Sequence, residues 1–224
     1  MKLKDRLKSD RETLRKLNRQ DQLLFIWDYY KIPILAAVSA LVLAVMVFAS
    51  WMGKKDVAMY AVFVNSNAAV VQTRPELLDE LLSTAGVDMD GKAIDITADL
   101  SLGKDYNNDT DGQTIQILAA LFGISGLDVF AAEQASFDRY AVQDAFVDLS
   151  LFLEPELYEK SGVTPYRYTG SDGQEIMGGI MLHPGTVLHD SGYYHEDVVI
   201  GVASNAQNLD EAVAFVKQLL KQAD

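Results

Sequence analysis

The chain has 224 residues, a net charge of −13 at neutral pH and no cysteine. The absence of cysteine excludes disulfide bonds, thiol catalysis, thiolate metal sites and attachment of a lipid through cysteine. The excess of acidic residues also argues against a nucleic-acid-binding protein, because phosphate contacts require lysine and arginine.

Residues 32–52 form a continuous run without a charged side chain. As a helix that rises about 1.5 Å per residue, this run is roughly 30 Å long, which matches the hydrocarbon layer of a bilayer. Trp27 and Trp51 flank it, where aromatic rings favour the membrane–water boundary. We therefore predict a transmembrane helix. A cleaved signal peptide has a shorter leader and a shorter apolar run, and a buried core helix rarely needs so long an uncharged run.

Charge on either side of this run predicts its orientation. Residues 1–31 contain nine Lys/Arg and five Asp/Glu, a net charge of +4. Lys54 and Lys55 add +2, and the chain total of −13 leaves −19 for residues 56–224. Because short basic flanks stay in the cytoplasm, we expect a cytoplasmic tail and an extracytoplasmic domain on a single-pass protein of the cell membrane. Lys54 and Lys55 argue for the opposite orientation.

The tail and the apolar run each offer a contact surface. Residues 1–31 have the pattern of a basic amphipathic helix, which suits a solvated anchor, a docking surface for a cytoplasmic partner or a contact with anionic lipid. Ala36, Ala40 and Ala44 recur at every fourth residue, a spacing that lets a second helix approach closely. We therefore expect a membrane-protein partner or self-association.

Residues 56–224 alternate between strand and helix patterns. Branched and aromatic runs predict strands, and amphipathic runs with capping residues predict helices. The expected strands are 57–65, 93–102, 127–132, 174–182 and 198–205, and the expected helices include 73–85, 110–123 and 208–220. We interpret residues 148–173 as broken helix and loop. This order predicts parallel strands joined by right-handed crossovers, and hence a three-layer α/β sandwich.

In such a sheet, ligands and partners contact the loops beyond the carboxyl ends of the strands. These loops are all polar here, and we predict that they form the ligand or partner site. Their residues are Asn65, Ser66, Asn67, Asp99, Ser101, Glu133, Gln134, Ser204 and Asn205.

Two stretches resemble a known family. TIQILAALFGISGLDVFAAEQASFDRYAVQDAFVDLSLFL and VVIGVASNAQNLDEAVAFVKQLL are similar to parts of bacterial extracellular solute-binding proteins, and together they cover about a third of the chain. The resemblance implies one lobe of a periplasmic-binding-protein-like fold. Members of that family have two lobes that close on the ligand, whereas this chain is too short for a second lobe, and they are commonly anchored by a lipidated cysteine that this chain lacks.

Candidate chemical motifs are incomplete. Asn107, Asp109, Asp111 and Gly112 match the opening of a calcium-binding loop, but the twelfth position, which requires a bidentate carboxylate, is Leu118. A looser calcium site remains an alternative to a polar turn that caps the next helix. His183, His189 and His195 have no zinc-site spacing, and Glu133 with Asp138 lacks a nucleophile–base partner. We expect no enzyme, no cofactor and no catalytic residue.

Two functions fit this pattern. The first is a membrane-anchored extracytoplasmic binding module that contacts a ligand or a partner protein through the strand-end loops. The alternative is a non-enzymatic assembly or scaffold subunit of a bacterial membrane complex in transport, secretion or the envelope, without a small-molecule ligand. Whether a small-molecule ligand exists is left open.

Overall fold

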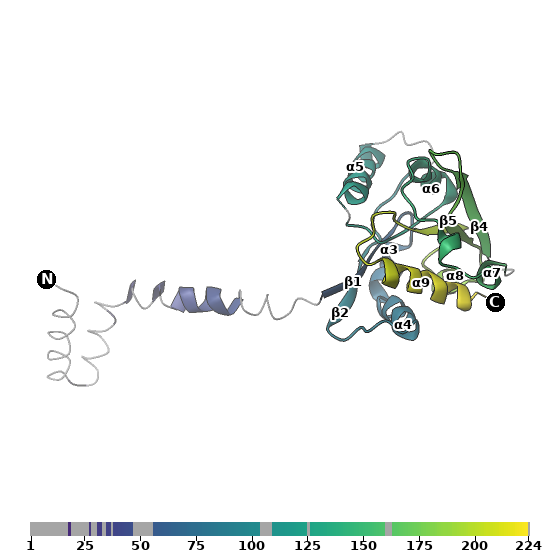
Figure 1. Cartoon of the computed structure of the whole chain (residues 1–224). Helices are drawn as coiled ribbons and strands as arrows, with labels where there is room; N and C mark the ends of the chain where they lie inside the picture. The colour runs from purple at the N-terminus through teal and green to yellow at the C-terminus, as the bar shows by residue number, and fades with distance from the viewer. Residues whose placement is uncertain are drawn as a thin grey trace. The chain divides into compact units, whose positions relative to one another are not determined.

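The computed structural model describes residues 56–103, 109–124, 126–159 and 163–223, together with residues 18, 27, 31–32, 35–36 and 38–46 (Figure 1). The chain divides into two units, Met1–Lys54 and Lys55–Asp224. In the first unit, Ala36, Ala40 and Ala44 are helical and exposed. No helix among the residues with described structure is both long and apolar enough to cross a membrane. Much of the predicted span, including residues 47–52, lies outside that set.

The second unit, called the α/β unit below, is built on one mixed six-stranded sheet. Its strands are β1 (Asp56–Phe63), β2 (Lys92–Thr97), β3 (Val129–Ala132), β4 (Val163–Thr169), β5 (Glu175–Leu182) and β6 (Val198–Val202). They lie side by side in the order β2-β1-β3-β6-β5-β4. β2, β1 and β3 are parallel, whereas β6, β5 and β4 each run antiparallel to the preceding strand. The expectation of parallel strands is therefore wrong for three of the five strand pairings.

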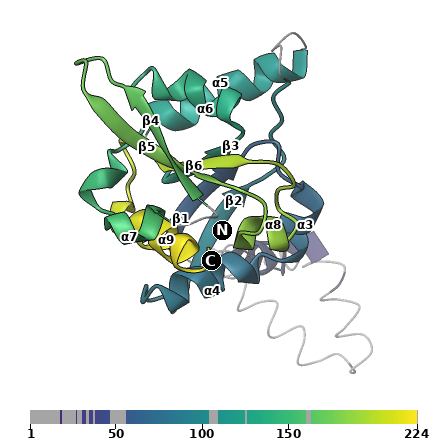
Figure 2. The ribbon, with the colours of Figure 1, turned by 90° about the vertical axis from the view of Figure 1, so that its right-hand side faces the viewer.

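Helices cover both faces of this sheet (Figures 1 and 2), as expected for an α/β sandwich. On one face lie α3 (Ala68–Thr73), α4 (Glu76–Thr84), α7 (Pro155–Tyr158), α8 (Val187–Asp190), α9 (Leu209–Lys221) and the 3-10 turn η1 (Leu149–Leu151). The other face carries α5 (Asp109–Gly123) and α6 (Gln134–Ala141). The apolar spacing of α9 buries Val213, Val216 and Leu220, which is why this helix packs along the sheet.

Two segments differ from the elements expected. The helix expected at 73–85 is α4, which begins only at Glu76, and the short helix α3 before it was not predicted; Pro75 separates the two because it has no backbone N–H with which to continue α3. The segment interpreted as broken helix and loop contains η1, α7 and β4. β4 is an edge strand, a position at which a proline such as Pro165 is tolerated because one side of the strand has no partner in the sheet.

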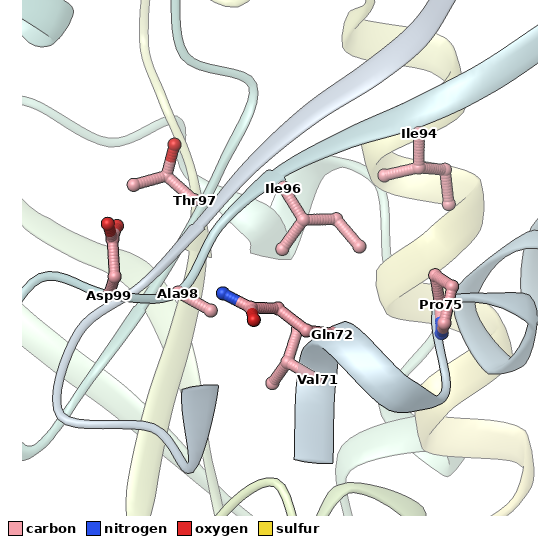
Figure 3. Close-up of a pocket in the computed structure, with 8 residues that line it drawn as sticks. All are labelled: Val71, Gln72, Pro75, Ile94, Ile96, Thr97, Ala98 and Asp99. Atoms are coloured by element: carbon pink, nitrogen blue, oxygen red, sulfur yellow. The ribbon is translucent and has the colours of Figure 1, made fainter. Parts of the chain in front are cut away.

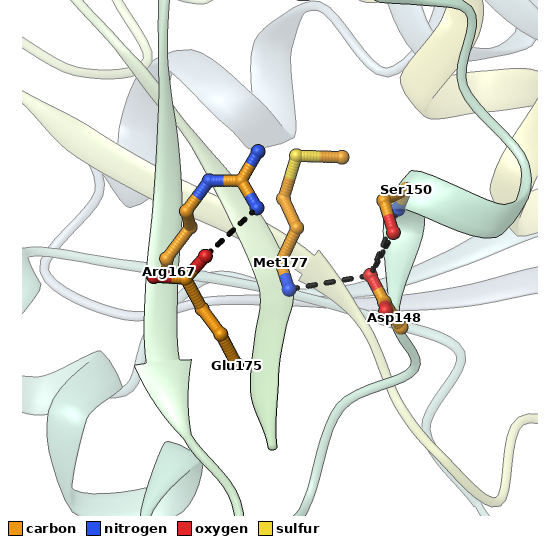
Figure 4. Close-up of polar contacts among 5 residues, drawn as sticks. All are labelled: Asp148, Ser150, Arg167, Glu175 and Met177. Atoms are coloured by element: carbon orange, nitrogen blue, oxygen red, sulfur yellow. Dashed lines mark hydrogen bonds and ion pairs between the residues drawn. The ribbon is translucent and has the colours of Figure 1, made fainter.

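Carboxylates tie turns to the sheet. Asp148 accepts hydrogen bonds from the backbone N–H of Ser150 (3.0 Å), from the Ser150 hydroxyl (2.7 Å) and from the backbone N–H of Met177 (3.2 Å), so it caps η1 and fixes it against β5 (Figure 4). Asp128 is 2% exposed and accepts from the backbone N–H groups of Tyr60 and Asn208, both at 2.9 Å. A buried carboxylate is costly unless it is hydrogen-bonded, and these donors join β1 to the start of α9.

Glycines in β5 and β6 make room for an aromatic ring. A Cβ atom at Gly201 would lie 2.5 Å from the Gly178 carbonyl oxygen and 2.7 Å from Cζ of Phe137. Phe137 of α6 is fully buried and stacks on Phe146 with ring centroids 4.0 Å apart. α6 therefore packs against the sheet at a point where only glycine fits.

We predict that Gly201→Ala lowers the free energy of unfolding by about 1–3 kcal/mol, because the backbone and Phe137 must both shift. Gly112→Ala is the matched control: its Cβ meets nothing within 4 Å in α5, and alanine favours a helix by up to about 1 kcal/mol. Urea denaturation measures both. Equal stability of the Gly201→Ala variant and the native chain would contradict the close packing.

Candidate functional site

A cavity of about 330 Å³ lies at the edge where β1 and β3 end. It is formed by the loop after β1, by Glu133 directly after β3, and by the segment that enters β6. The lining residues are Asn65, Ser66, Asn67, Glu133, Tyr193, Tyr194, His195, Glu196 and Asp197. The structure thus brings together four of the residues predicted from the sequence, and we call this cavity the edge cavity.

Asn65 links three chain segments at the rim of the edge cavity. Its side-chain amide donates to the Leu102 carbonyl (2.8 Å) and to the Glu133 carboxylate, and its side-chain oxygen accepts from the Leu102 N–H (2.8 Å). Its φ of +56° lies in the left-handed region, which asparagine tolerates better than most residues. Asn65 therefore holds the loop after β2 and the end of β3 against the end of β1.

Ser66 and Asn67 also bond within the fold. The Ser66 hydroxyl donates to the carbonyl groups of Phe63 and Ala98, at 3.1 and 3.2 Å. The Asn67 side chain accepts from the N–H of Val70 and caps α3. The polar character that marked this loop in the sequence is therefore explained in large part by internal hydrogen bonds.

Tyr193 and Tyr194 form the buried base of the edge cavity. The Tyr194 hydroxyl lies 3.1 Å from the carbonyl oxygens of both Val64 and Ala131, at the ends of β1 and β3. The Tyr193 hydroxyl donates to the Arg74 carbonyl at 2.6 Å. The backbone carbonyl of Tyr193 accepts from the Asn67 N–H at 2.9 Å. Burial raises the pKa of Tyr193 to about 12, with a further contribution from the charge of Glu76. Burial, followed by the charge of Glu133, holds the pKa of Tyr194 well above its usual range.

A wider depression of about 690 Å³ adjoins the edge cavity and shares Glu133, His195, Glu196 and Asp197 with it. Gln134 and Pro184 also line the depression. Among the described residues, neither hollow is lined by a lysine or arginine, whereas the carboxylates of Glu133, Glu196 and Asp197 line both. The surface at this edge therefore has a negative potential that favours a cationic group.

The imidazole ring of His183 makes a contact through each of its two nitrogens, at the same edge of the sheet as the edge cavity. Its Nε2 lies 2.8 Å from the Thr164 hydroxyl, and its Nδ1 lies 3.0 Å from an Asp197 carboxylate oxygen. The order of hydroxyl, imidazole and carboxylate is that of a nucleophile, base and orienting acid. These residues stand at the neighbouring ends of β4, β5 and β6, so strand pairing alone accounts for their contact.

The other two histidines are also accounted for. His189 lies 2.8 Å from the Thr186 hydroxyl through Nδ1 and 2.8 Å from the Glu196 carbonyl through Nε2, so it holds α8 to the segment before β6. His195 is exposed and lines both hollows.

Asp99 lies apart from the edge cavity. It lines a separate hollow of about 430 Å³ between α3 and the edge strand β2, together with Gln72, Ile94 and Ile96 (Figure 3). In Figure 3 the isoleucines of β2 project toward α3, so this hollow is more apolar on one side. Ser101 is exposed in the loop after β2, and the next residue in the chain, Leu102, bonds to Asn65.

Ser204 and Asn205 lie at the opposite end of the sheet, so the expectation that they join the other loops is wrong. β6 runs antiparallel to β3, and its carboxyl end therefore points away from the edge cavity. The Asn205 side chain donates to the Phe122 carbonyl at 2.5 Å, and both residues line a hollow of about 480 Å³ between α5 and α6.

The calcium candidate is only partly covered by the structure. Asn107 lies outside the described residues. Asp111 is 2% exposed, and its carboxylate accepts from the Gly103 N–H at 2.8 Å, as a turn or cap residue would. Among the residues that the structure describes, no group of three or more His, Cys, Asp or Glu side chains is placed to hold a metal ion.

The sequence reasoning missed the segment from Tyr193 to Asp197, which contributes five of the lining residues. It precedes a strand, and in a parallel sheet the residues before a strand lie at the opposite edge. The available signal was the pair of tyrosines next to three polar residues, because adjacent aromatic side chains in a polar loop indicate an anchored loop.

We predict that the free energy of unfolding falls between pH 10 and pH 12, because in this range Tyr193 ionises in the unfolded chain but keeps its proton in the folded one. Its folded pKa of about 12 exceeds the unfolded value of 10.0, so the stabilisation is complete below pH 10 and is lost as the pH rises toward 12. The expected loss is about 2 kcal/mol. Tyr193→Phe should be less stable at pH 8, because it lacks the bond to Arg74, but should show a shallower decline above pH 10. Urea titrations at each pH measure this, and an unchanged slope in the variant would contradict it.

Comparison of the chain with protein-family models, with characterised proteins and with solved structures gives no match. The resemblance to solute-binding proteins thus rests on the two stretches of sequence given above. The function is accordingly inferred from the residues and geometry of the edge cavity.

Proposed function

We propose that the protein is a membrane-anchored binding module whose edge cavity binds a cationic group of a ligand or partner. One observation carries the proposal: three separate chain segments converge on one cavity, and among the residues that the structure describes it is lined by the carboxylates of Glu133, Glu196 and Asp197 and by no lysine or arginine. Cavities of roughly 300–1,000 Å³ are the usual size for small-molecule sites, and this one lies at the low end of that range.

The size and charge of the edge cavity limit what it binds. Its volume of about 330 Å³ suits an ammonium or guanidinium group with a short stem rather than a whole sugar or peptide. Asp197 is already paired with His183, and Glu133 accepts from Asn65, so both carboxylates are held in place before a ligand arrives. A preorganised site loses less conformational entropy on binding.

The anchoring part of the proposal rests on the uncharged run of residues 32–52 and its basic flank. In this arrangement residues 1–31 lie in the cytoplasm and the α/β unit lies outside the membrane. The family resemblance agrees with a single extracytoplasmic lobe that has the fold of one solute-binding lobe and lacks the second lobe that would close on a ligand.

A scaffold subunit of a membrane complex is the second candidate, and one observation favours it. Each of Asn65, Ser66 and Asn67 makes side-chain hydrogen bonds inside the fold, which leaves fewer groups for a small ligand. A rigid polar rim of this kind suits a protein partner that presents a lysine or arginine side chain.

We expect cationic probes to raise the melting temperature of the full chain in mild detergent, because a ligand that binds only the folded state stabilises it. Choline and arginine amide serve as probes, and glucose and acetate serve as controls, all at constant ionic strength. Glu133→Gln combined with Glu196→Gln should weaken binding at least tenfold. Glu80→Gln, on the exposed side of α4, removes one acidic charge away from the edge cavity and should leave binding unchanged.

The edge-cavity proposal fails if the rise in melting temperature does not saturate with probe concentration. It also fails if Glu80→Gln weakens probe binding as much as the double variant does. The first result would mean that cations only screen the net charge of the chain. If neither cationic probe gives a saturable rise in the melting temperature, the result favours the scaffold candidate.

We expect protease added to intact cells to degrade the α/β unit and to spare residues 1–31. The chain should also remain in the membrane pellet after a carbonate wash, because a transmembrane helix is not released by high pH. An epitope tag at each terminus reports both results. Release by carbonate would contradict the anchor, and protection of the carboxyl-terminal tag would contradict the orientation.

A further inference from the structure

All three histidines of the chain lie in one stretch, between the end of β5 and the start of β6. They are His183, His189 and His195, and the same stretch carries the residues that enter the edge cavity before β6. Imidazole is the side chain whose charge ordinarily changes between about pH 5 and pH 8. The positive side-chain charge that the chain gains in mild acid therefore falls on this stretch.

His183 can take up a proton without losing either of its contacts. Its Nδ1 lies 3.0 Å from the Asp197 carboxylate, which only accepts hydrogen bonds, so Nδ1 carries the hydrogen in the neutral ring. Nε2 then accepts from the Thr164 hydroxyl at 2.8 Å. Because Thr164 is exposed, its hydroxyl can turn to accept from a protonated Nε2 and donate to water. The imidazolium stays beside Asp197 and offsets its negative charge.

His195 adds a second charge in the edge cavity itself. Its exposed side chain lines the edge cavity and the adjoining depression, as Glu133, Glu196 and Asp197 do. Protonation of His183 and His195 therefore sets two positive charges against the three negative charges of these carboxylates. Because like charges repel, the protonated site has lost most of the attraction for a cation on which the proposed binding depends.

His189 lies in the same stretch but lines neither hollow. Its Nε2 lies 2.8 Å from the Glu196 carbonyl, which only accepts, so Nε2 carries the hydrogen and Nδ1 accepts from the Thr186 hydroxyl at 2.8 Å. Thr186 is 1% exposed, so a proton on Nδ1 would leave a buried hydroxyl hydrogen without this acceptor. His189 thus ties α8 to the segment before β6 and serves as a control for the other two histidines.

We expect the other described groups around these rings to keep their charge between pH 5.5 and pH 8. Burial holds the pKa of Tyr193 at about 12 and the pKa of Tyr194 well above its usual range, so both stay neutral. Carboxylates in proteins, such as that of the exposed Asp190 in α8, usually titrate near pH 4. The uncharged residues that line the two hollows are Asn65, Ser66, Asn67, Gln134, Ala135 and Pro184.

We propose that protons compete with the cationic ligand of the edge cavity through His183 and His195, so that the protein binds the cation near neutral pH and releases it in mild acid. This inference rests on the proposed function, to which it adds the regulation of the same site. Because the coupling between two bound species is reciprocal, the cation in turn drives protons off the two histidines. Binding in the middle of this pH range therefore releases protons.

Calorimetric titration of the full chain in mild detergent with choline tests the coupling, because choline keeps its charge at every pH. We expect its Kd to rise at least tenfold from pH 8.0 to pH 5.5 at constant ionic strength. His183→Gln combined with His195→Gln should reduce that rise to less than threefold, whereas His189→Gln, the matched control, should keep it. At pH 6.5, choline should release protons from the native chain and none from the double variant, measured as the dependence of the heat on the ionisation enthalpy of the buffer.

The outcomes separate this inference from the proposed function. Saturable choline binding at pH 8.0 with an equal Kd at pH 5.5 overturns the inference and leaves the proposed function standing. The inference is also overturned by a rise that persists in the double variant, which would assign the effect to the carboxylates, or by one that is lost in His189→Gln. Absence of saturable binding at any pH overturns the proposed function and this inference with it. Circular dichroism of each variant at each pH verifies that the fold is kept.

Discussion

The hydroxyl group of Tyr194 is the contact on which the arrangement of the carboxyl edge depends. It lies within hydrogen-bond distance of the Val64 carbonyl, directly after β1, and of the Ala131 carbonyl in β3, and it is buried there. The Ala131 carbonyl also accepts from the Val64 N–H. A buried carbonyl without a partner costs about 1–3 kcal/mol, so a hydrogen bond from the tyrosine to Val64 stabilises the end of β1 and holds the tyrosine's own segment over it. His195, Glu196 and Asp197 follow directly in the chain, and their position at the edge cavity is a consequence.

The reversal of direction between β3 and β6 decides which loops share that edge. Because β6 enters the sheet from the edge where β1 and β3 leave it, the residues before β6 meet the residues after β1 and β3. The same reversal carries Ser204 and Asn205 to the other end of the sheet, next to Phe122 of α5. Because β6 pairs antiparallel with β3, the edge cavity with its carboxylates and the hollow between α5 and α6 lie at opposite ends of the sheet.

The sequence predicted the elements whose patterns arise from burial. β1 and β6 are apolar runs because both of their faces are covered, and α9 shows a clear helical spacing because only one of its sides is buried. The direction of a strand leaves no such trace, since the alternation of side chains reads the same both ways, and this is why the antiparallel pairings of β6, β5 and β4 were not predicted. β4 was missed because its exposed residues and Pro165 at a sheet edge resemble a loop. Of the residues that line the edge cavity, those after β1 and β3 could be placed together from the sequence, whereas those before β6 required knowledge of the strand pairing.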